Sequence, residues 1–494
     1  MKTFCFTDGI ATVLAVAVCT IAHGIRAQDA ETPGGNETAS APSAETAAPV
    51  TLKTAEQLIE EYDLPTVTEG PPVTLAEALK AANANNPSLA AVRTGIEEAQ
   101  AKEKAAWGAV LPYVYGEMGY TVRDHADTVN FGDSLSGMFP AGVEIPDTGE
   151  MVITNRQDLN GSLKATMPIF NFQSWVRIRV AKDAVELSRL SAEEVRRQLL
   201  LNAAEIYFRA MAARKLIEMQ LATMASLVQH LAVAEARFNA GAGLRIDVIR
   251  AQTDLSDAKQ QIIAANLAFD NARDALSRLT GIEGLPMPTD EPEIAVPEGD
   301  EEAQQRSALT QRPDILAADA SVELNRRMLR ESRSQFLPTL NAFWQGSYQF
   351  TDTGDLGSSD KSRMIAVFTL MVPLYNHARY GDLDMKRAAL RRSEFEREAR
   401  IADVSMNVRK ARRDYASSLT SVTVAEQGET LAQEALTLTH AAYSGGAGSS
   451  LDVTDAMRTV MQADINLATK RLESQITLLR LLYAVGEDMS SVDK

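Results

Sequence analysis

The chain has 494 residues, of which 45% are hydrophobic, and a formal net charge of −17 at pH 7. This length is enough for one large domain or two to three ordinary ones. The acidic balance argues against a nucleic-acid partner, because a negatively charged protein is repelled by a phosphate backbone.

Residues 1–27 are predicted to be a signal peptide for export. Lys2 supplies a positive charge, residues 9–22 are apolar, and cleavage is expected after Ala27, although Ile25 is an unusual residue for that position. The apolar stretch is too short to favour a transmembrane helix. The protein is therefore expected to leave the cytoplasm.

Both cysteines of the chain, Cys5 and Cys19, lie within this signal peptide. The exported chain should lack cysteine, which excludes a disulfide scaffold, a thiol nucleophile and a cysteine-ligated metal site. A lipid anchor on Cys19 is an alternative, but it requires a small residue just before the cysteine, where Val18 stands. No later segment has 18 consecutive apolar residues, so any membrane-spanning part must be built from β-strands.

Residues 28–72 are predicted to be a disordered leader with a possible short helix at residues 51–62. Residues 29–50 are rich in Ala, Glu, Thr, Pro and Ser, which can bury little apolar surface. The ordered fold is expected to begin at residue 73, because Thr74 and Glu77 have the spacing of a capping box at a helix start.

Two related repeats are predicted, at residues 73–285 and 303–488, with an acidic linker at 286–302 and a C-terminal tail at 489–494. Landmarks of the first repeat recur in the second at one constant offset: Pro168 at Pro373, Gly241 at Gly446, Asp247 at Asp452 and Gly281 at Gly486. Pro87 and Pro112 recur at a larger offset, at Pro313 and Pro338. The difference between the two offsets places additional residues in the first repeat, in a polar loop at about 123–157.

Two proline-free stretches, residues 172–238 and 377–443, predict very long helices. Apolar residues recur there at intervals of three and four, and 67 helical residues would extend roughly 100 Å. Residues 245–280 and 450–485 are predicted as partner helices of about half that length. An ordinary soluble coiled coil would account for these helices taken alone.

A predicted β-hairpin interrupts the helices in each repeat, at about 113–171 and 339–375. Alternation places Trp344, Gly346 and Tyr348 on one face of a strand, with polar residues largely on the other. Segments of 10 to 14 residues are about the length of a tilted transmembrane strand. Because four strands cannot close a barrel and open edges cannot face lipid, closure would require several chains.

With these features in place, residues 73–488 resemble the TolC-like outer-membrane efflux protein family. The resemblance rests on residues 74–79, Asn86-Pro87, the Leu-Pro helix ends, the paired Pro-Ile-Phe-Asn and Pro-Leu-Tyr-Asn motifs, and the duplicated Gly/Asp-Val helix starts. It implies a mainly α protein of the outer membrane: a homotrimer with a periplasmic α-barrel and a 12-stranded transmembrane β-barrel in contact with lipid, four strands coming from each protomer. It also implies no enzymatic activity and no cofactor.

The resemblance further implies a passive exit duct of a tripartite efflux system, with a periplasmic adaptor (membrane fusion) protein and an inner-membrane RND-type or ABC pump as partners. Residues 312–315 (Arg-Pro-Asp-Ile) are more similar to the efflux branch. Type I protein secretion is the alternative within the same class. A periplasmic coiled-coil scaffold or adaptor without a pore is the alternative of another class, but it leaves the aromatic strands unexplained.

The family gate lies at the tips of the helical hairpins, which the resemblance places at the turns around Gly241, Gly243, Gly446 and Gly448. It matches Tyr443 to a tyrosine that holds the closed state. Gly448 stands where the family has an arginine, and Arg245 on the facing turn is the suggested substitute.

The resemblance also matches Asp452 and Asp455 to aspartates that line the pore constriction. Asp452 could equally be a helix-start acid, since Asp247 has the same place in the first repeat and is a weaker gate candidate. The counterpart of Asp455 is Arg250, so no shared helical requirement explains it. The four remaining histidines (His125, His230, His377 and His440) are scattered, and neither a catalytic set nor a metal site is predicted.

Overall fold

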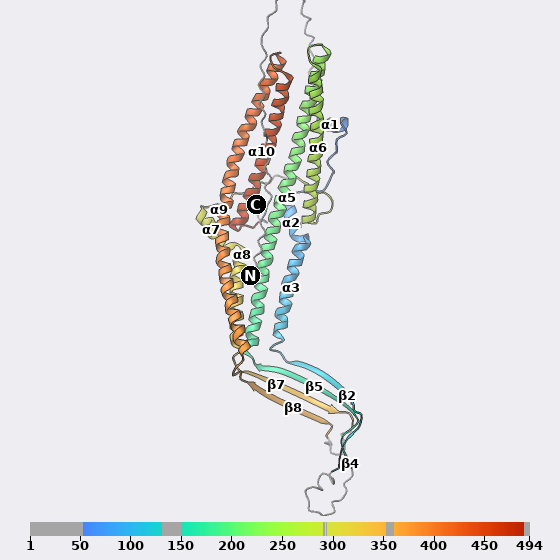
Figure 1. Ribbon diagram of the computed structural model, residues 1–494, viewed down its shortest axis with the longest axis vertical. Coiled ribbons are helices and arrows are strands. Elements are labelled where there is room, and N and C mark those ends of the chain that lie inside the picture. The colour runs from blue at the N-terminus through green and yellow to red at the C-terminus, as the bar shows by residue number, and fades with distance from the viewer. Residues whose placement is uncertain (1–52, 131–149, 290–291, 293, 352–359, 489–494) are drawn as a thin grey trace, which may run out of the picture. The chain divides into compact units, whose positions relative to one another are not determined.

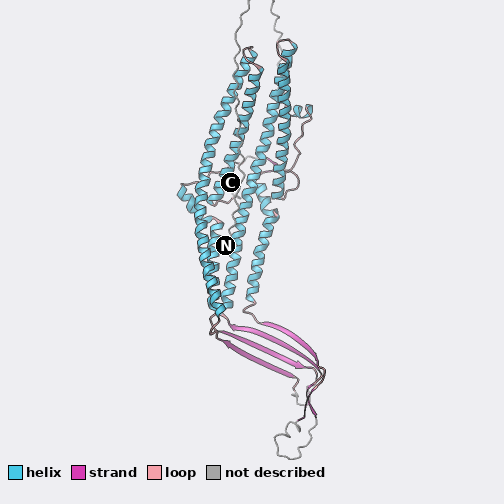
Figure 2. Ribbon diagram, in the orientation of Figure 1, coloured by secondary structure: helices cyan, strands magenta, loops and turns pink. Residues whose placement is uncertain are grey.

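A computed structural model describes residues 53–130, 150–289, 292, 294–351 and 360–488. Long helices run side by side, and the strands lie beyond one of their ends (Figure 2). The predicted signal peptide, the start of the leader and the C-terminal tail lie outside the described residues.

Two pairs of helices have equal lengths. Helices α5 (Phe172–Asn239) and α9 (His377–Ser444) have 68 residues each, and α6 (Arg245–Thr280) and α10 (Ser450–Val485) have 36 each. Asn171 and Asn376 cap the starts of the long helices. Each short helix ends at a glycine with positive φ, which avoids the Cβ strain of that conformation. The predicted long helices and their half-length partners are thus confirmed.

Shorter helices flank the long ones in the half nearer the strands. They are α2 (Leu75–Asn85), α3 (Pro87–Trp107), α7 (Glu301–Gln311) and α8 (Pro313–Ser334). Thr74 and Glu77 form the predicted capping box at the start of α2. Helix α3 packs on α5, and α8 packs on both α5 and α9 (Figure 1).

One antiparallel sheet contains the four predicted strands: β2 (Tyr113–Val122), β5 (Gln157–Phe170), β7 (Thr339–Gln349) and β8 (Ser362–Met371), in the order β2-β5-β7-β8. Ala165 pairs with Trp344, which pairs with Ala366. The apolar face predicted for β7 therefore lies on the same side of the sheet as Leu163 and Ala165 of β5.

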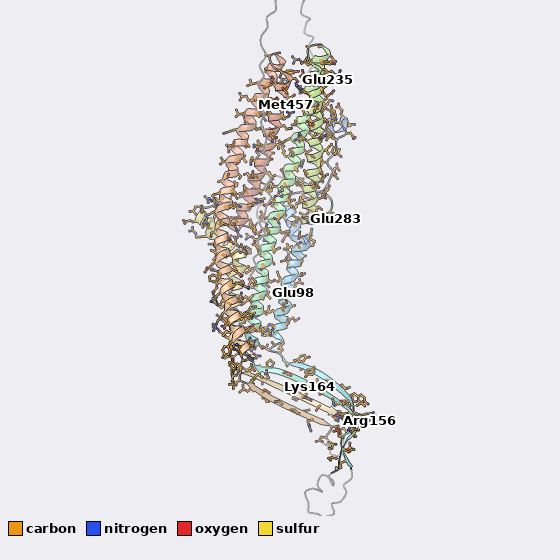
Figure 3. The ribbon with its side chains drawn as sticks, viewed as in Figure 1. Glu98, Arg156, Lys164, Glu235, Glu283 and Met457 are labelled. Carbon is orange, nitrogen blue, oxygen red and sulfur yellow. The ribbon has the colours of Figure 1, made fainter. Side chains whose placement is uncertain are left out.

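The two sides of this sheet differ in chemistry. Because side chains alternate along a strand, the register assigns Met118, Leu163, Tyr348, Met364 and Phe368 to one side, where Met364 is 78% and Phe368 70% exposed. By the same register, the other side carries polar residues, including Asp158, Lys164, Gln345 and Gln349. Lys164, labelled in Figure 3, pairs there with Glu117 at 2.5 Å. An apolar outer side and a polar inner side are typical of a transmembrane barrel.

The polar loop predicted at 123–157 begins and ends as paired strands. Strand β3 (Asp127–Asn130) pairs with β4 (Glu150–Thr154). β-Branched residues in these two segments favour extended backbone, although the surrounding region is rich in charged and turn-forming residues. Residues 131–149 lie outside the described residues.

The leader was predicted to be disordered apart from a possible short helix at about 51–62, and the structure has a helix there within a longer segment that packs on the fold. We refer to residues 53–73 as the strap. It contains α1 (Ala55–Glu61) and β1 (Pro72–Val73), which pairs in parallel with β6 (Met287–Pro288) in the predicted linker. Leu58 is fully buried and Leu64 is 7% exposed. These apolar residues anchor a segment whose average composition suggested disorder.

Helix α5 is at the centre of the core. Its apolar residues pack with α2 and α10 in one cluster and with α6 and the strap in another. Within the described residues it is the one helix long and apolar enough to cross a membrane by length and composition, with a third (33%) of that window buried. Its contacts with α3, α6, α8 and α10 account for that composition.

Candidate gate at the tips of the helical hairpins

The turns at the two hairpin tips have similar geometry. Gly241 and Gly446 have φ values of 71° and 77°, a conformation that favours glycine. A Cβ added to Gly243 would lie 3.0 Å from the backbone nitrogen of Phe238, and one at Gly448 would lie 3.0 Å from that of Tyr443. Gly448 therefore lets the turn fold closely onto the end of α9, where a larger residue would force the backbone apart.

Tyr443, the tyrosine matched to the gate, is buried between the two hairpins. The guanidinium of Arg237 on α5 lies 4.2 Å from its ring centroid, and Nη1 of Arg237 donates a hydrogen bond to the Tyr443 carbonyl at 3.4 Å. Arg245, the suggested substitute for the missing arginine, is exposed. Arg237 was not predicted. Its counterpart in the second repeat is Ala442, so the two repeats differ at this position, and that difference is the sequence signal that points to Arg237.

His230 is a second contact between the hairpins. It is 5% exposed, its Nε2 lies 3.3 Å from the Ser450 hydroxyl at the start of α10, and its ring centroid is 6.1 Å from that of Tyr443. A cavity of about 630 Å³ adjoins it. Burial lowers the pKa of His230; nearby His440 lowers it further, while the carboxylates of Asp254 and Asp247 oppose the shift.

Asp254 on α6 and Arg458 on α10 form the third contact, with Oδ1 and Nη2 2.9 Å apart. The side chain of Asp254 is 13% exposed. We refer to the three pairs Arg237–Tyr443, His230–Ser450 and Asp254–Arg458 as the tip contacts. Each joins a residue of the α5–α6 hairpin to one of the α9–α10 hairpin; Glu235 and Met457 mark the tip regions in Figure 3.

The structure places the aspartates in different environments. Asp452 completes a capping box with Ser449, and these hydrogen bonds hold the pKa of its carboxyl below the usual range. Asp247 lies in the first turn of α6, 3.9 Å from Arg250. Asp455 is 60% exposed and lies 3.7 Å from Arg458. Of the three, Asp455 has no role in starting a helix. Among the described residues, no group of three or more potential ligands could hold a metal ion.

Comparison with known proteins connects this arrangement to a family. The family described as outer membrane efflux protein matches residues 78–282 and 305–487, more than half of the chain. The chain belongs to this family. Its members are transport channels rather than enzymes. The protein is thus an outer-membrane channel for efflux or secretion, with its helical domain in the periplasm.

Several relatives of this efflux protein are curated. TolC of Vibrio cholerae serotype O1 is 24% identical over 422 residues, covering 83% of this chain and 90% of the relative. TolC of Salmonella enteritidis is 26% identical over 358 residues, covering 67% and 70%. The alkaline protease secretion protein AprF of Pseudomonas aeruginosa is 24% identical, covering 66% and 69%. A crystal structure of CusC, at 19% identity, has the same fold, with a TM-score of 0.70 over 84% of this chain and 92% of that one.

Proposed function

We propose that three copies of this efflux protein close head to tail into one continuous duct. The observation that carries the proposal is which elements form the two outer edges of the sheet and of the layer of packed helices. The sheet ends in β2 on one side and β8 on the other. Packed helices follow the order α3-α5-α8-α9 near the sheet and α6-α5-α10-α9 near the tips. In the sheet and at both levels of the helices, one outer edge is therefore formed by the first half of the chain and the other by the second half.

Such edges suit a closed ring of identical chains. An open strand edge cannot face lipid, because its backbone groups would have no hydrogen-bond partners. Joining β8 to β2 of the next copy removes every edge, and the same step brings α9 beside α6. Three copies give 12 strands, the number implied by the family and within the range of known barrels. The exposed apolar side of the sheet then faces lipid and the polar side lines the duct.

We also propose that the two halves are a duplication. The offset that relates Asp247 to Asp452 carries the bounds of α5 and α6 onto those of α9 and α10. The additional residues of the first half then belong to the β3–β4 extension. With the helices in the periplasm, this extension at the opposite end of the barrel would lie outside the cell.

The tip contacts supply a closed state for this duct. They hold the α9–α10 hairpin against the α5–α6 hairpin, with Tyr443 buried between them, and bring Asp452 and Asp455 to the constriction. Opening would separate the hairpins and break the contacts. The proposed partners are a periplasmic adaptor and an inner-membrane RND-type or ABC pump.

Efflux of small toxic compounds is the proposed branch, and protein secretion remains the second candidate, because relatives include AprF as well as TolC. The side chains of residues 312–315 do not decide between them: Arg312 binds Asp314 and the Ala484 carbonyl, which is a structural role. Deleting the gene should raise susceptibility to small toxic compounds. Unchanged susceptibility together with loss of a secreted protein would favour secretion.

Single-channel recording in planar bilayers tests the duct and its closed state together. The wild-type protein should show a small conductance, and Arg237→Ala should increase it several-fold by releasing Tyr443. Arg245→Ala, which removes an exposed arginine near the same tip, is the matched control and should behave as wild type. Failure of all three proteins to conduct would contradict the proposed function.

A further inference from the structure

The strap fills a groove on the first hairpin. Its apolar residues Ile59, Tyr62, Leu64 and Val67 pack in one cluster with residues of α5 and α6. The ammonium of Lys259 lies 4.3 Å from the centroid of the Tyr62 ring, and Asn266 donates a hydrogen bond to the Pro65 carbonyl at 3.4 Å. Lys259 and Asn266 thus contact the strap directly, and Met224, Val228 and Ile262 are among the α5 and α6 residues in the same cluster.

The same positions of the second hairpin line an open groove. At the offset that relates the two hairpins, Lys259 and Asn266 correspond to Asp464 and Arg471, and the other three residues correspond to Glu429, Gln433 and Leu467. All five line one groove of about 600 Å³ on α9 and α10, beside α5. Within the described part of the chain, no segment covers this groove as the strap covers its counterpart.

The open groove has a different chemistry from the filled one. Met224 and Lys259 of the first hairpin are replaced by the half-buried carboxylates of Glu429 and Asp464. Burial and the charge of Glu429 raise the pKa of Asp464.

The three cations that line the open groove have partners: Arg214 and Lys215 lie 3.6 and 3.1 Å from Glu218, and Arg471 lies 3.0 Å from Glu426. Among the described residues, neither Glu429 nor Asp464 forms an ion pair. The lining also includes the apolar side chains of Phe208, Met211 and Leu472.

We propose that this groove docks a strap-like segment of a periplasmic partner protein, in which a lysine or arginine flanked by apolar residues enters between Glu429 and Asp464. The proposal rests on the duplication and on the periplasmic duct described under the proposed function, where the adaptor is the protein positioned to supply such a segment. The chain's own leader does not fit, because residues 28–52 contain no lysine or arginine and four acidic residues.

The probe is a fluorescent peptide of strap residues 53–67 carrying Tyr62→Lys and Asp63→Lys. In the filled groove the Tyr62 ring contacts Lys259, whose counterpart in the open groove is Asp464. The first change therefore gives the peptide an ammonium at the position expected to face Asp464. Binding to the full-length protein in detergent is measured by fluorescence anisotropy. We expect saturable binding with one peptide per chain, and about tenfold weaker binding of the unchanged strap peptide, as for the loss of one half-buried charge pair.

The decisive comparison uses two protein variants of equal charge. Glu429→Gln with Asp464→Asn should weaken binding of the basic peptide about tenfold, whereas Glu434→Gln with Glu473→Gln, outside the groove, should leave it unchanged. Equal affinity for both variants, or no saturable binding to wild type, would overturn the proposed docking site. Bilayer conductance of the Glu429/Asp464 variant should match wild type in either case, so failure of the docking proposal is distinguishable from failure of the duct.

Discussion

At the hairpin tips, charge and aromatic contacts join residues that lie far apart in the sequence. Tyr443 and the two aspartates could be placed from the sequence because short motifs with glycine and aspartate mark the turns. Arg237, His230 and Asp254 could not be placed, because each lies inside a long helix and acts through a partner in the other half of the chain. Their contacts depend on how the two hairpins pack, which helical periodicity alone does not determine.

Asp455 is expected to govern ion selectivity. In a ring of three chains, Asp452 and Asp455 would place six carboxylates around the constriction, which attracts cations. Asp455→Ala should therefore reduce the preference for cations in single-channel recordings, measured at low salt where screening is weak. Asp247→Ala should leave selectivity unchanged and cost about 1 kcal/mol of stability as a lost helix-start acid. Unchanged selectivity in an Asp452/Asp455 double alanine variant would remove both residues from the pore.

His230 is expected to make the closed state sensitive to acid. Its pKa in the closed tip is lowered by burial from the ordinary value of 6.5. A solvated His230 in an open tip binds a proton more readily, so the closed state becomes less stable relative to the open state as the pH falls below about 6.5. Asp254, Asp247, His440 and Arg237 face or adjoin this site and set the size of the effect.

Open probability should therefore rise between pH 7.5 and 5.5 in bilayer recordings. His230→Gln keeps a polar side chain of similar reach and should flatten this dependence. His440→Gln, an exposed histidine of the same region, should retain most of it. An equal rise at acid pH in the His230 variant would assign the effect to other groups.

Among the elements, those with strong periodic patterns were predicted well. The long helices, their glycine ends and the four long strands follow from proline-free periodicity, capping residues and alternation. The helix of the strap was considered possible, but its packing was not predicted, because α1 is short and its anchors, Leu58 and Leu64, are separated by acidic residues. Strands β3 and β4 were missed because they are short segments within a polar region.

An exposed apolar stripe on α9 is expected to form part of the interface between copies. Val424, Leu431 and Leu438 lie seven residues apart and are 62 to 66% exposed, and α6 exposes Ile263 and Leu267 by 52% and 63%. A seven-residue spacing keeps side chains on one side of packed helices. Leu431→Asp should therefore weaken assembly, since burying a leucine contributes about 1.5–3 kcal/mol per contact.

The measurement is the mass of the complex in mild detergent by light scattering. Thr430→Asp adds the same charge one residue away on another side of α9 and should assemble normally. Equal assembly of both variants would show that the stripe is not part of the interface.

At the scale of the whole molecule, three surfaces of the single chain lack the partners that such surfaces normally have. Its sheet is open at two edges, its apolar sheet surface is uncovered, and one side of α9 lacks a partner among the described residues of its own chain. Closing the ring addresses all three at once. The sequence could indicate that closure was needed, from the count of four strands, but the consistent order of the edges became evident only from the packing.

Disulfide trapping across the sheet edges tests the ring most directly. Residues 28–494 contain no cysteine, so pairs can be introduced without background, combining Tyr115→Cys or Gly119→Cys on β2 with Ile365→Cys or Thr369→Cys on β8 to sample the register. Within one chain these edges are three strand spacings, about 14 Å, apart, too far for a disulfide. The ring predicts that at least one pair, upon oxidation, gives a ladder of one, two and three chains on a denaturing gel that stops at three, and that single-cysteine variants give no such ladder. Monomers alone from every pair, or a ladder that continues past three, would contradict it.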